Sequence, residues 1–338
     1  MKKIKSISIG IPAHNEEKNL ANLLDSIFSQ KITGVKLEKI IIALDGCTDD
    51  TEKIAKKYKS KHSIIKIIND KKRFGKAQRV NQIYKLNKSD LLIMLDADLV
   101  ISEKISIQKA IQEFKNNKKI SLLALRQIPI WTNSLMGNAS VLSYLIYENS
   151  FLNYNSGNNI YSLQGAAYVI KKSLSKKITY PKNTIADHKF LYMQAIEKTG
   201  RGSYQISNES KVFFRTISTF NDWRLQGTRS VFSDIENINS IYGEKVKKEY
   251  QMPKKLYKNS VIKFLMIYPF ETTIAVFMNL LIRVFPKKRN KSGVWELAKS
   301  SKLEISFSTP NQKPQYSHQN SLLFRSLMLV TMFFKDWS

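Results

Sequence analysis

Runs of consecutive apolar residues alternate with amphipathic segments through the first hundred residues of the chain. Residues 91–95 (LLIML) are all apolar, which is typical of a strand buried on both faces of a helix-covered sheet. Similar strands are expected at residues 6–12, 39–44 and 63–68. Three helices are expected between them: one from residue 16 onward, one after Thr48 and one over residues 75–86. The first of these has an apolar stripe at positions i, i+3, i+4, i+7 and i+8. This alternation predicts an α/β fold with a doubly wound, mainly parallel sheet.

The following hundred residues continue the pattern less regularly. A helix is expected over residues 103–116 and a strand over residues 121–125. Residues 164–170 form another apolar run that opens near a glycine, and a helix is expected to begin around Asp187 and to end at Gly200.

Acidic and basic side chains follow the expected strands at their carboxyl ends. Asp96 and Asp98 lie two residues apart, so in an extended segment both carboxylates address one site. The ends of the four strands bring together residues 12–16, 45–46, 73–76 and 96–98 at one edge of the sheet, where open α/β sheets bind ligands. Three acidic and two basic groups there suit a nucleoside diphosphate with a hard divalent cation. Because neither glycine-rich phosphate-loop pattern is present, a dinucleotide domain or a P-loop NTPase is disfavoured.

Net charge and cysteine content narrow the picture further. The 55 Lys and Arg exceed the 27 Asp and Glu, and the formal charge of +28 favours anionic partners such as nucleic acid, anionic lipid or phosphorylated substrates. A single cysteine, Cys47, excludes an internal disulfide. Strand-like sequence follows the first lysines directly, without a leader-like segment, so the N-terminus is expected in the cytosol.

The composition changes after about residue 250. The segment 264–282 is a largely apolar stretch of nineteen residues with one charged residue, Glu271. Lysines or arginines flank both of its ends. This segment can lie in the plane of an anionic membrane surface, span the membrane, or pack against the rest of the chain or a partner copy. A second apolar run, residues 322–334, is too short to cross a bilayer.

Four fragments in register carry a resemblance to a known family: IPAHNEEKNL, ALDGCTDDT, RFGKAQRVN and LLIMLDADLVI. Together they resemble the nucleotide-sugar half of the family 2 inverting glycosyltransferases of GT-A fold, of the bacterial or archaeal cell-envelope glycan or glycolipid type. The resemblance implies a divalent metal cofactor, Mg²⁺ or Mn²⁺, held with the donor diphosphate and ribose by Asp96 and Asp98. It also implies that the donor nucleotide pocket is lined by Pro12, His14 and Glu16. It further implies that Asp45 contacts the base and that Gly75 and Lys76 lie near the ribose and phosphates.

Two later segments extend the resemblance. Asp187 matches the Asp of the family's Glu-Asp-x-x-Leu motif, which implies that it is the general base; Ala186 replaces the usual Glu, and His188 is placed to take over part of its role. Gln226 and Arg229 match the Gln-x-x-Arg-Trp segment that lies over the diphosphate. Ser230 stands where that segment has Trp, which favours a single-transfer enzyme over a processive synthase.

The predicted function is therefore transfer of a sugar, with inversion, from a nucleotide donor such as a UDP-sugar to a hydroxyl of a lipid-linked or cell-envelope glycan. A catalytic domain is expected over residues 1–250, with a nucleotide-sugar half (1–100) and an acceptor half (101–250), followed by a basic helical tail (251–338) at the cytoplasmic face of the cell membrane. Three alternatives stay open: transfer to polyprenyl phosphate, an inactive sugar-nucleotide-binding scaffold, and a nucleic-acid-binding protein. The oligomeric state also stays open.

Overall fold

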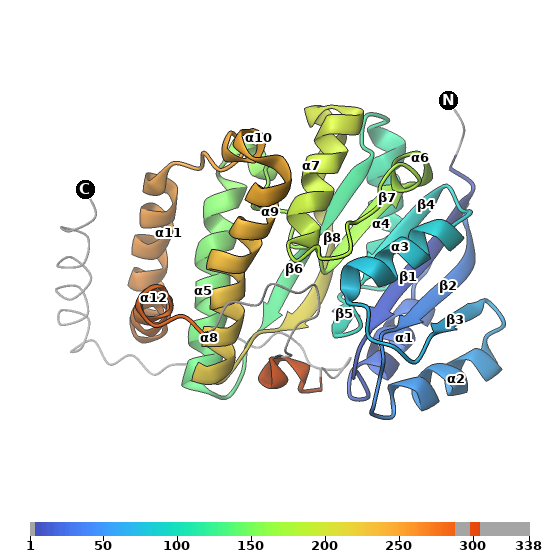
Figure 1. The fold of residues 1–338 in the computed structure, drawn as a ribbon, viewed down its shortest axis with the longest axis horizontal. Helices are drawn as coiled ribbons and strands as arrows, with labels where there is room; N and C mark the ends of the chain where they lie inside the picture. Colours follow the sequence, from blue (N-terminus) through green and yellow to red (C-terminus); the bar gives the residue numbers. More distant parts are fainter. Residues whose placement is uncertain (1–3, 288–297, 305–338) are drawn as a thin grey trace.

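A single eight-stranded sheet organises the computed structural model, which describes residues 4–287 and 298–304. The strand order is β3-β2-β1-β4-β7-β6-β8-β5 (Figure 1). The strands have the bounds β1 (Ser6–Ala13), β2 (Lys36–Leu44), β3 (Ile65–Asn69), β4 (Leu91–Leu95), β5 (Leu99–Ile101), β6 (Leu122–Ile130), β7 (Ala167–Lys171) and β8 (Tyr204–Arg215).

The two halves of the sheet differ in strand direction. β1, β2, β3 and β4 pair in parallel, and β6 pairs in parallel with β8. β7 runs antiparallel to both β4 and β6, and β5 runs antiparallel to β8. The prediction of a mainly parallel, doubly wound sheet is therefore confirmed, with an antiparallel contribution in the second half that the sequence did not indicate.

Helices cover both faces of the sheet, because the strands are apolar on both sides. On β2, Ile40, Ile42 and Leu44 join one core cluster, whereas Ile41 and Ala43 join the opposite one. The first cluster lies under α1 (Leu20–Phe28), α2 (Thr51–Lys61) and α4 (Ser106–Asn116), and the second under α3 (Lys76–Leu86), α6 (Lys172–Ser175), α7 (Asp187–Thr199) and α9 (Asp234–Tyr242). The two-residue period of the strands thus builds two cores from one sheet.

Several predicted boundaries are corrected by the structure. The helix expected from residue 16 begins at Leu20, because residues 16–19 form a turn in which the Asn19 amide donates to the Glu16 carbonyl over 3.0 Å. The strand expected from residue 164 begins at Ala167, after Gly165 takes a φ of 79°. The strand expected over 63–68 is Ile65–Asn69, and the helix expected over 103–116 begins at Ser106.

A helical layer that the sequence only partly indicated lies beside the sheet. It consists of α5 (Leu135–Leu152), α8 (Phe220–Thr228), α11 (Lys254–Ile267) and α12 (Pro269–Val284), which share a third apolar cluster. The α8 helix leads through a π-helix, η3 (Arg229–Ser233), into α9, and the short α10 (Glu244–Lys247) precedes α11. Figure 1 shows α11 and α12 at the opposite end of the molecule from β3.

The apolar stretch at residues 264–282 is divided between two helices. α11 ends at Ile267 and α12 begins at Pro269, whose missing amide proton is tolerated in the first turn of a helix but not in its interior. Glu271, the single charge of the stretch, is buried. Among the described residues, every helix is too short or too polar to cross a bilayer. The second apolar run, residues 322–334, lies outside the described residues.

Candidate active site

Four carboxylates from distant parts of the chain meet at the carboxyl ends of the parallel strands. Glu16 follows β1, Asp96 and Asp98 follow β4, and Asp187 opens α7. The side chain of Lys76, at the first position of α3, links two of them: its Nζ lies 2.7 Å from Asp96 Oδ2 and 3.4 Å from Asp187 Oδ2. The same ammonium donates to the Gly165 carbonyl over 3.1 Å. The structure therefore brings the predicted diphosphate-binding and base residues into one charged cluster.

Asp187 is held as a carboxylate by its surroundings. Burial alone would raise its pKa, but the charges of Lys76 and Arg229, together with the hydrogen-bonding contact of His188, outweigh burial and hold the pKa of Asp187 well below its usual range. His188 Nδ1 lies 3.4 Å from Asp187 Oδ1, and its Nε2 lies 3.9 Å from Asp234 Oδ2. Burial lowers the pKa of His188, so the ring contributes a neutral polar neighbour at pH 7.

The other three carboxylates respond differently to burial. Burial raises the pKa of Asp96 to about 6 against the opposing charge of Lys76. Burial and the Asp98 charge raise the pKa of Glu16 to about 8, and the ammonium of Lys302 opposes this shift. For Asp98, burial is outweighed by Lys302, which lowers the pKa. Such divergent shifts within one cluster are typical of a functional site.

Lys302 is a site residue that the sequence did not indicate. Its Nζ donates to Glu16 Oε1 and, over 2.9 Å, to Asp98 Oδ2. It belongs to η4 (Lys299–Lys302), more than two hundred residues along the chain from Asp98. An isolated lysine in a lysine-rich tail gives no sequence signal for such a contact.

Asp45 lies at the end of β2 with its carboxylate engaged inside the protein. It accepts hydrogen bonds from the amides of Phe74, over 2.7 Å, and Gly75, over 3.0 Å, and from Arg79 Nε, over 3.0 Å. Its backbone carbonyl lies 2.6 Å from His14 Nδ1. Asp45 thus fixes the loop that precedes Lys76, and its predicted contact with a base stays a prediction.

The structure places the three remaining predicted donor residues on different elements, namely β1, α8 and η3. Pro12 is buried on β1 beside Ala43 of β2. Arg229 opens the π-helix η3, 3.8 Å from Asp234, and its charge acts on both Asp187 and Lys76. Gln226 is exposed on α8. A π-helical turn beside a charged cluster is common at functional sites.

The carboxylates suit a hard cation chemically. Glu16 and Asp98 already converge on one ammonium, and carboxylate oxygens are the ligands that Mg²⁺ and Mn²⁺ prefer. Asp96, the other predicted ligand, is directed to Lys76 instead. Within the described ranges, no group of three or more His, Cys, Asp or Glu is arranged to hold a metal by itself. A cation here would therefore need oxygens from a bound diphosphate and water to complete its coordination.

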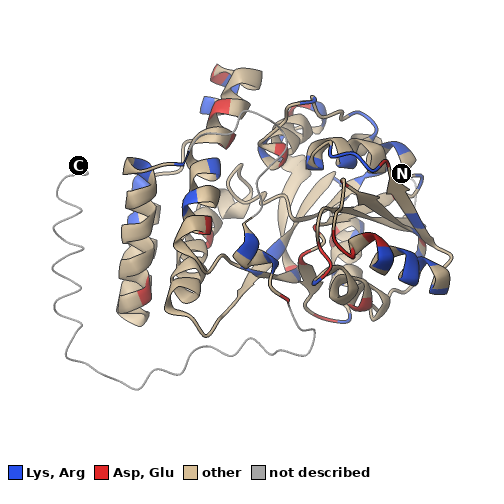
Figure 2. Cartoon of the chain, turned by 60° about the horizontal axis from the view of Figure 1, so that its bottom comes forward, with Lys and Arg blue, Asp and Glu red and all other residues tan. Residues whose placement is uncertain are grey.

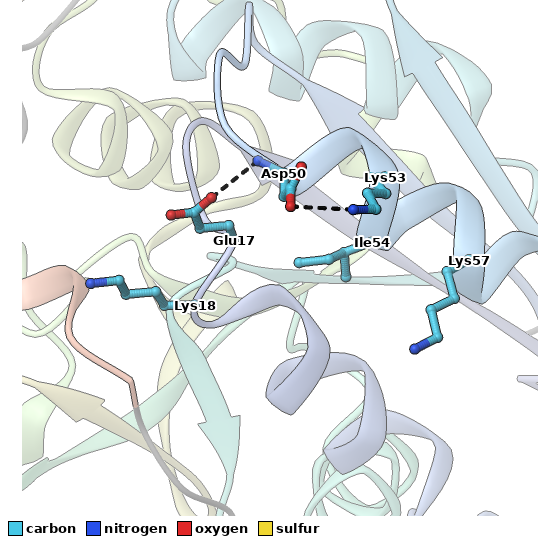
Figure 3. Close-up of a pocket in the computed structure, with 6 residues that line it drawn as sticks. All are labelled: Glu17, Lys18, Asp50, Lys53, Ile54 and Lys57. Atoms are coloured by element: carbon cyan, nitrogen blue, oxygen red, sulfur yellow. Dashed lines mark hydrogen bonds and ion pairs between the residues drawn. The ribbon is translucent and has the colours of Figure 1, made fainter.

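A shallow surface hollow of about 390 Å³ lies near the start of α2 and contains none of the predicted site residues. Figure 3 shows its lining residues, with Glu17 bonded to the Asp50 amide over 3.1 Å and Lys53 3.6 Å from Asp50. The other lining residues are Lys18, Ile54 and Lys57. The charged cluster at the strand ends, and not this hollow, is the candidate active site.

Known proteins resemble the chain in sequence and in fold. Residues 8–179 match the model of the family described as "Glycosyl transferase family 2". The 4,4'-diaponeurosporenoate glycosyltransferase of Staphylococcus aureus (strain bovine RF122 / ET3-1) is 26% identical over 143 residues, which are 42% of this chain and 36% of that protein. The match thus spans about a third of the length of this curated relative.

Solved structures show the fold likeness. A mannosyltransferase from Pyrobaculum calidifontis in complex with GDP-Man and Mn²⁺ superimposes with a TM-score of 0.52 at 12% identity, over 82% of this chain and 74% of that one. Glucosyl-3-phosphoglycerate synthase from Mycobacterium tuberculosis, in complex with Mn²⁺, UDP and glucosyl-3-phosphoglycerate, gives 0.48 at 15% identity, over 70% and 79%. The first likeness, with the strand order above, confirms the expected GT-A fold.

Proposed function

Since the chain belongs to glycosyl transferase family 2 and is a glycosyltransferase, we propose that its acceptor is a hydroxyl of a lipid-linked or cell-envelope glycan. The donor is a nucleoside-diphosphate sugar, which we propose to be a UDP-sugar, and transfer proceeds with inversion. One observation carries the proposal: Lys76 Nζ bridges Asp96 and Asp187, so the group proposed to bind the donor and the proposed base lie within reach of one ammonium.

Departure of the sugar leaves negative charge on the diphosphate, and the site supplies cations for it. Lys76 is placed to take part of this charge, with Arg229 nearby. Mg²⁺ or Mn²⁺, held by Asp98 with Asp96 or Glu16, would supply Lewis-acid stabilisation of the leaving group. The mannosyltransferase of similar fold was solved with GDP-Man and Mn²⁺, which supports this choice of donor and cofactor class.

Asp187 is the proposed general base. Its carboxylate stays ionised at neutral pH, and it is the single carboxylate of the cluster that comes from the acceptor half of the chain. One base that deprotonates a hydroxyl opposite the leaving group gives inversion. Asp187→Asn is expected to lower kcat toward a hydroxyl acceptor by about 10²- to 10⁴-fold, while donor affinity changes little. Full activity of this variant would instead favour transfer to a polyprenyl phosphate, whose nucleophile is already ionised.

A donor screen tests the proposal as a whole. UDP-, GDP- and TDP-sugars are added with Mn²⁺ to the full chain, and donor hydrolysis and thermal stabilisation are both recorded. One class, expected to be UDP-sugars, raises the melting temperature in a metal-dependent manner, and Asp98→Ala abolishes the effect. The proposal fails if every sugar nucleotide leaves the wild type unchanged in both assays.

We also propose that the helical layer faces an anionic membrane surface. Large exposed apolar side chains lie on α11 and α12 and at the residue that follows α12: Ile262, Met266, Ile267, Phe270, Phe277, Val284 and Phe285. Lysines and an arginine lie on or beside the same helices, and Figure 2 shows basic residues at both ends of the molecule. Exposed apolar area next to basic groups is typical of in-plane attachment to anionic lipid.

Vesicle sedimentation tests this placement. Wild-type protein is expected to bind vesicles that contain anionic lipid more strongly than neutral vesicles, and Met266→Ser with Phe277→Ser is expected to reduce binding to both. Ile235→Ser on α9, another exposed apolar side chain, serves as the control. Equal binding by the double variant and the control would contradict attachment through α11 and α12.

A further inference from the structure

Residues 298–304, called the strap below, place Lys302 in the charged cluster at the carboxyl ends of the strands. Ser300 fixes one part: its amide donates to Asp222 Oδ2 over 2.8 Å, and its hydroxyl accepts from the Ser218 amide over 3.0 Å. Asp222 is itself buried at the start of α8. These contacts attach the strap to α8 and to the segment between β8 and α8.

The other part of the strap is attached next to α1 and at the end of β8. Asn19 Nδ2, next to α1, donates to the Lys302 carbonyl over 3.1 Å. Arg215 Nη2, at the end of β8, donates to the Glu304 carbonyl over 2.9 Å. Backbone atoms of the strap are therefore bonded on both sides of the site, which fixes where the Lys302 side chain enters.

The ammonium of Lys302 occupies the position where two carboxylates meet. Its Nζ is within hydrogen-bond distance of both Glu16 and Asp98, and Glu16 is only 4% exposed. Glu16, which is buried, and Asp98, whose side chain is 26% exposed, repel each other as carboxylates unless a cation lies between them, and here Lys302 is that cation. A second cation can reach the same oxygens only when Lys302 leaves.

We propose that the strap is a built-in competitor of the divalent cation, in which Lys302 holds Glu16 and Asp98 until a metal ion displaces it. The inference rests on the proposed function, because that function places a divalent cation at these carboxylates. Metal binding and strap release are then coupled: each metal ion that binds opens the strap, and a detached strap increases metal affinity by the same factor.

Titration of the full chain with Mn²⁺ measures this competition without any turnover. The electron paramagnetic resonance signal of free Mn²⁺ reports how much of the ion is unbound at each step. If the strap is closed in about nine molecules of ten, Lys302→Ala lowers the dissociation constant for Mn²⁺ about tenfold. Ser300→Pro, which removes the amide bonded to Asp222 but keeps Lys302, is expected to lower it as well. Lys299→Ala, an exposed lysine of the same strap, is the matched control and leaves the constant unchanged.

Trypsin gives a second readout on the wild type. Mn²⁺ alone is expected to speed cleavage after Lys302, because the displaced side chain becomes accessible. Slower cleavage with Mn²⁺ would overturn the inference and identify the strap as a lid that closes over the cation. Equal Mn²⁺ affinity in the wild type and Lys302→Ala, or weaker affinity in the variant, would also overturn it.

The inference and the proposed function fail in different ways. If Lys302→Ala binds Mn²⁺ more tightly but no sugar nucleotide acts as a donor, competition by the strap stands and the proposed function falls. If a donor is hydrolysed in the presence of EDTA, and neither the wild type nor Lys302→Ala binds Mn²⁺, the transferase activity stands and competition by the strap falls.

Discussion

Arg79→Met removes a buried cation that fixes the loop before Lys76. The Arg79 side chain is fully buried, and its Nε donates to Asp45 Oδ1 over 3.0 Å. Its other nitrogens donate to Asp70 Oδ2 over 2.5 Å and to the Lys72 carbonyl over 2.6 Å. Methionine fills much of the same volume but leaves these acceptors, and Gln82 Oε1 as well, without this donor.

The expected cost follows from the burial of each partner. Asp45 is 5% exposed, so loss of its cation leaves a buried charge with only two backbone amides, and breaking such a pair costs about 3–5 kcal/mol. The Asp70 side chain is 40% exposed, so water replaces that contact at a cost of at most about 1 kcal/mol. We expect a loss of roughly 3–5 kcal/mol, a large part of the stability of a typical domain.

Urea denaturation measures the loss, and a double-mutant cycle identifies its cause. Because the cost arises from an uncompensated Asp45 charge, Asp45→Asn combined with Arg79→Met is expected to be milder than the sum of the single changes by about 1–3 kcal/mol. Lys53→Met, which removes a cation from an exposed pair with Asp50, is the control and is expected to change stability by less than about 0.5 kcal/mol. A loss below about 1 kcal/mol in Arg79→Met, or strict additivity in the cycle, would refute the reasoning.

Two further predictions concern stability. Burial lowers the pKa of Lys189 to about 8, which corresponds to roughly 3 kcal/mol of destabilisation below pH 8, and this cost disappears as pH rises from 8 to 10.5. Lys189→Met is therefore expected to be more stable than the wild type at pH 7, and denaturation curves should show this difference shrinking between pH 8 and 10.5. A difference in stability that stays constant across these pH values would contradict the prediction. Gly10→Ala places a Cβ 2.5 Å from Ile83 and 2.6 Å from Met94, and should lower the free energy of unfolding by about 1–3 kcal/mol, whereas Gly202→Ala, which meets nothing within 4 Å, should not.

The sheet was predictable where the chain alternates regularly, and less so where tertiary contacts decide. β1 to β4 and α1 to α3 follow from periodicity because each strand is apolar on both faces and each helix has one apolar stripe. The α5 helix has no such stripe: buried residues run around it from Gly137 to Phe151, since it lies between β6 and the pair α11 and α12. A helix that is apolar on all sides gives no periodic signal.

The strand β8 was also missed, for a different reason. Its twelve residues include five polar ones in a row, from Ser207 to Lys211, which interrupt any strand pattern. The register with β6 shifts near Arg126, and Ser207 and Ser210 are buried against neighbouring elements. Pairing with β6 and β5 stabilises this segment as a strand despite its composition, which only the assembled sheet reveals.

For the site, the sequence identified anions better than the cations that neutralise them. Asp96 and Asp98 follow a buried strand, so local pattern alone places them at the sheet edge, whereas Asp187 was identified by the resemblance of its segment to the family motif. Lys302 reaches Glu16 across 286 positions, and nothing near it in the chain distinguishes it from the other lysines. Long-range ion pairs of this kind are set by the fold, so the periodicity of the sequence does not predict them.

The same pairs explain how the site stays folded before any ligand binds. Asp96 and Asp187 face Lys76, and Glu16 and Asp98 face Lys302, so each pair of carboxylates has one ammonium. In the proposed site, a donor diphosphate would bind Lys76 and a divalent cation would bind Asp98 with Asp96 or Glu16. A cation that takes the place of Lys302 would bring positive charge to the carboxylates, whereas a diphosphate alone would add negative charge beside them. We therefore expect the donor and the cation to bind more tightly together than either one alone.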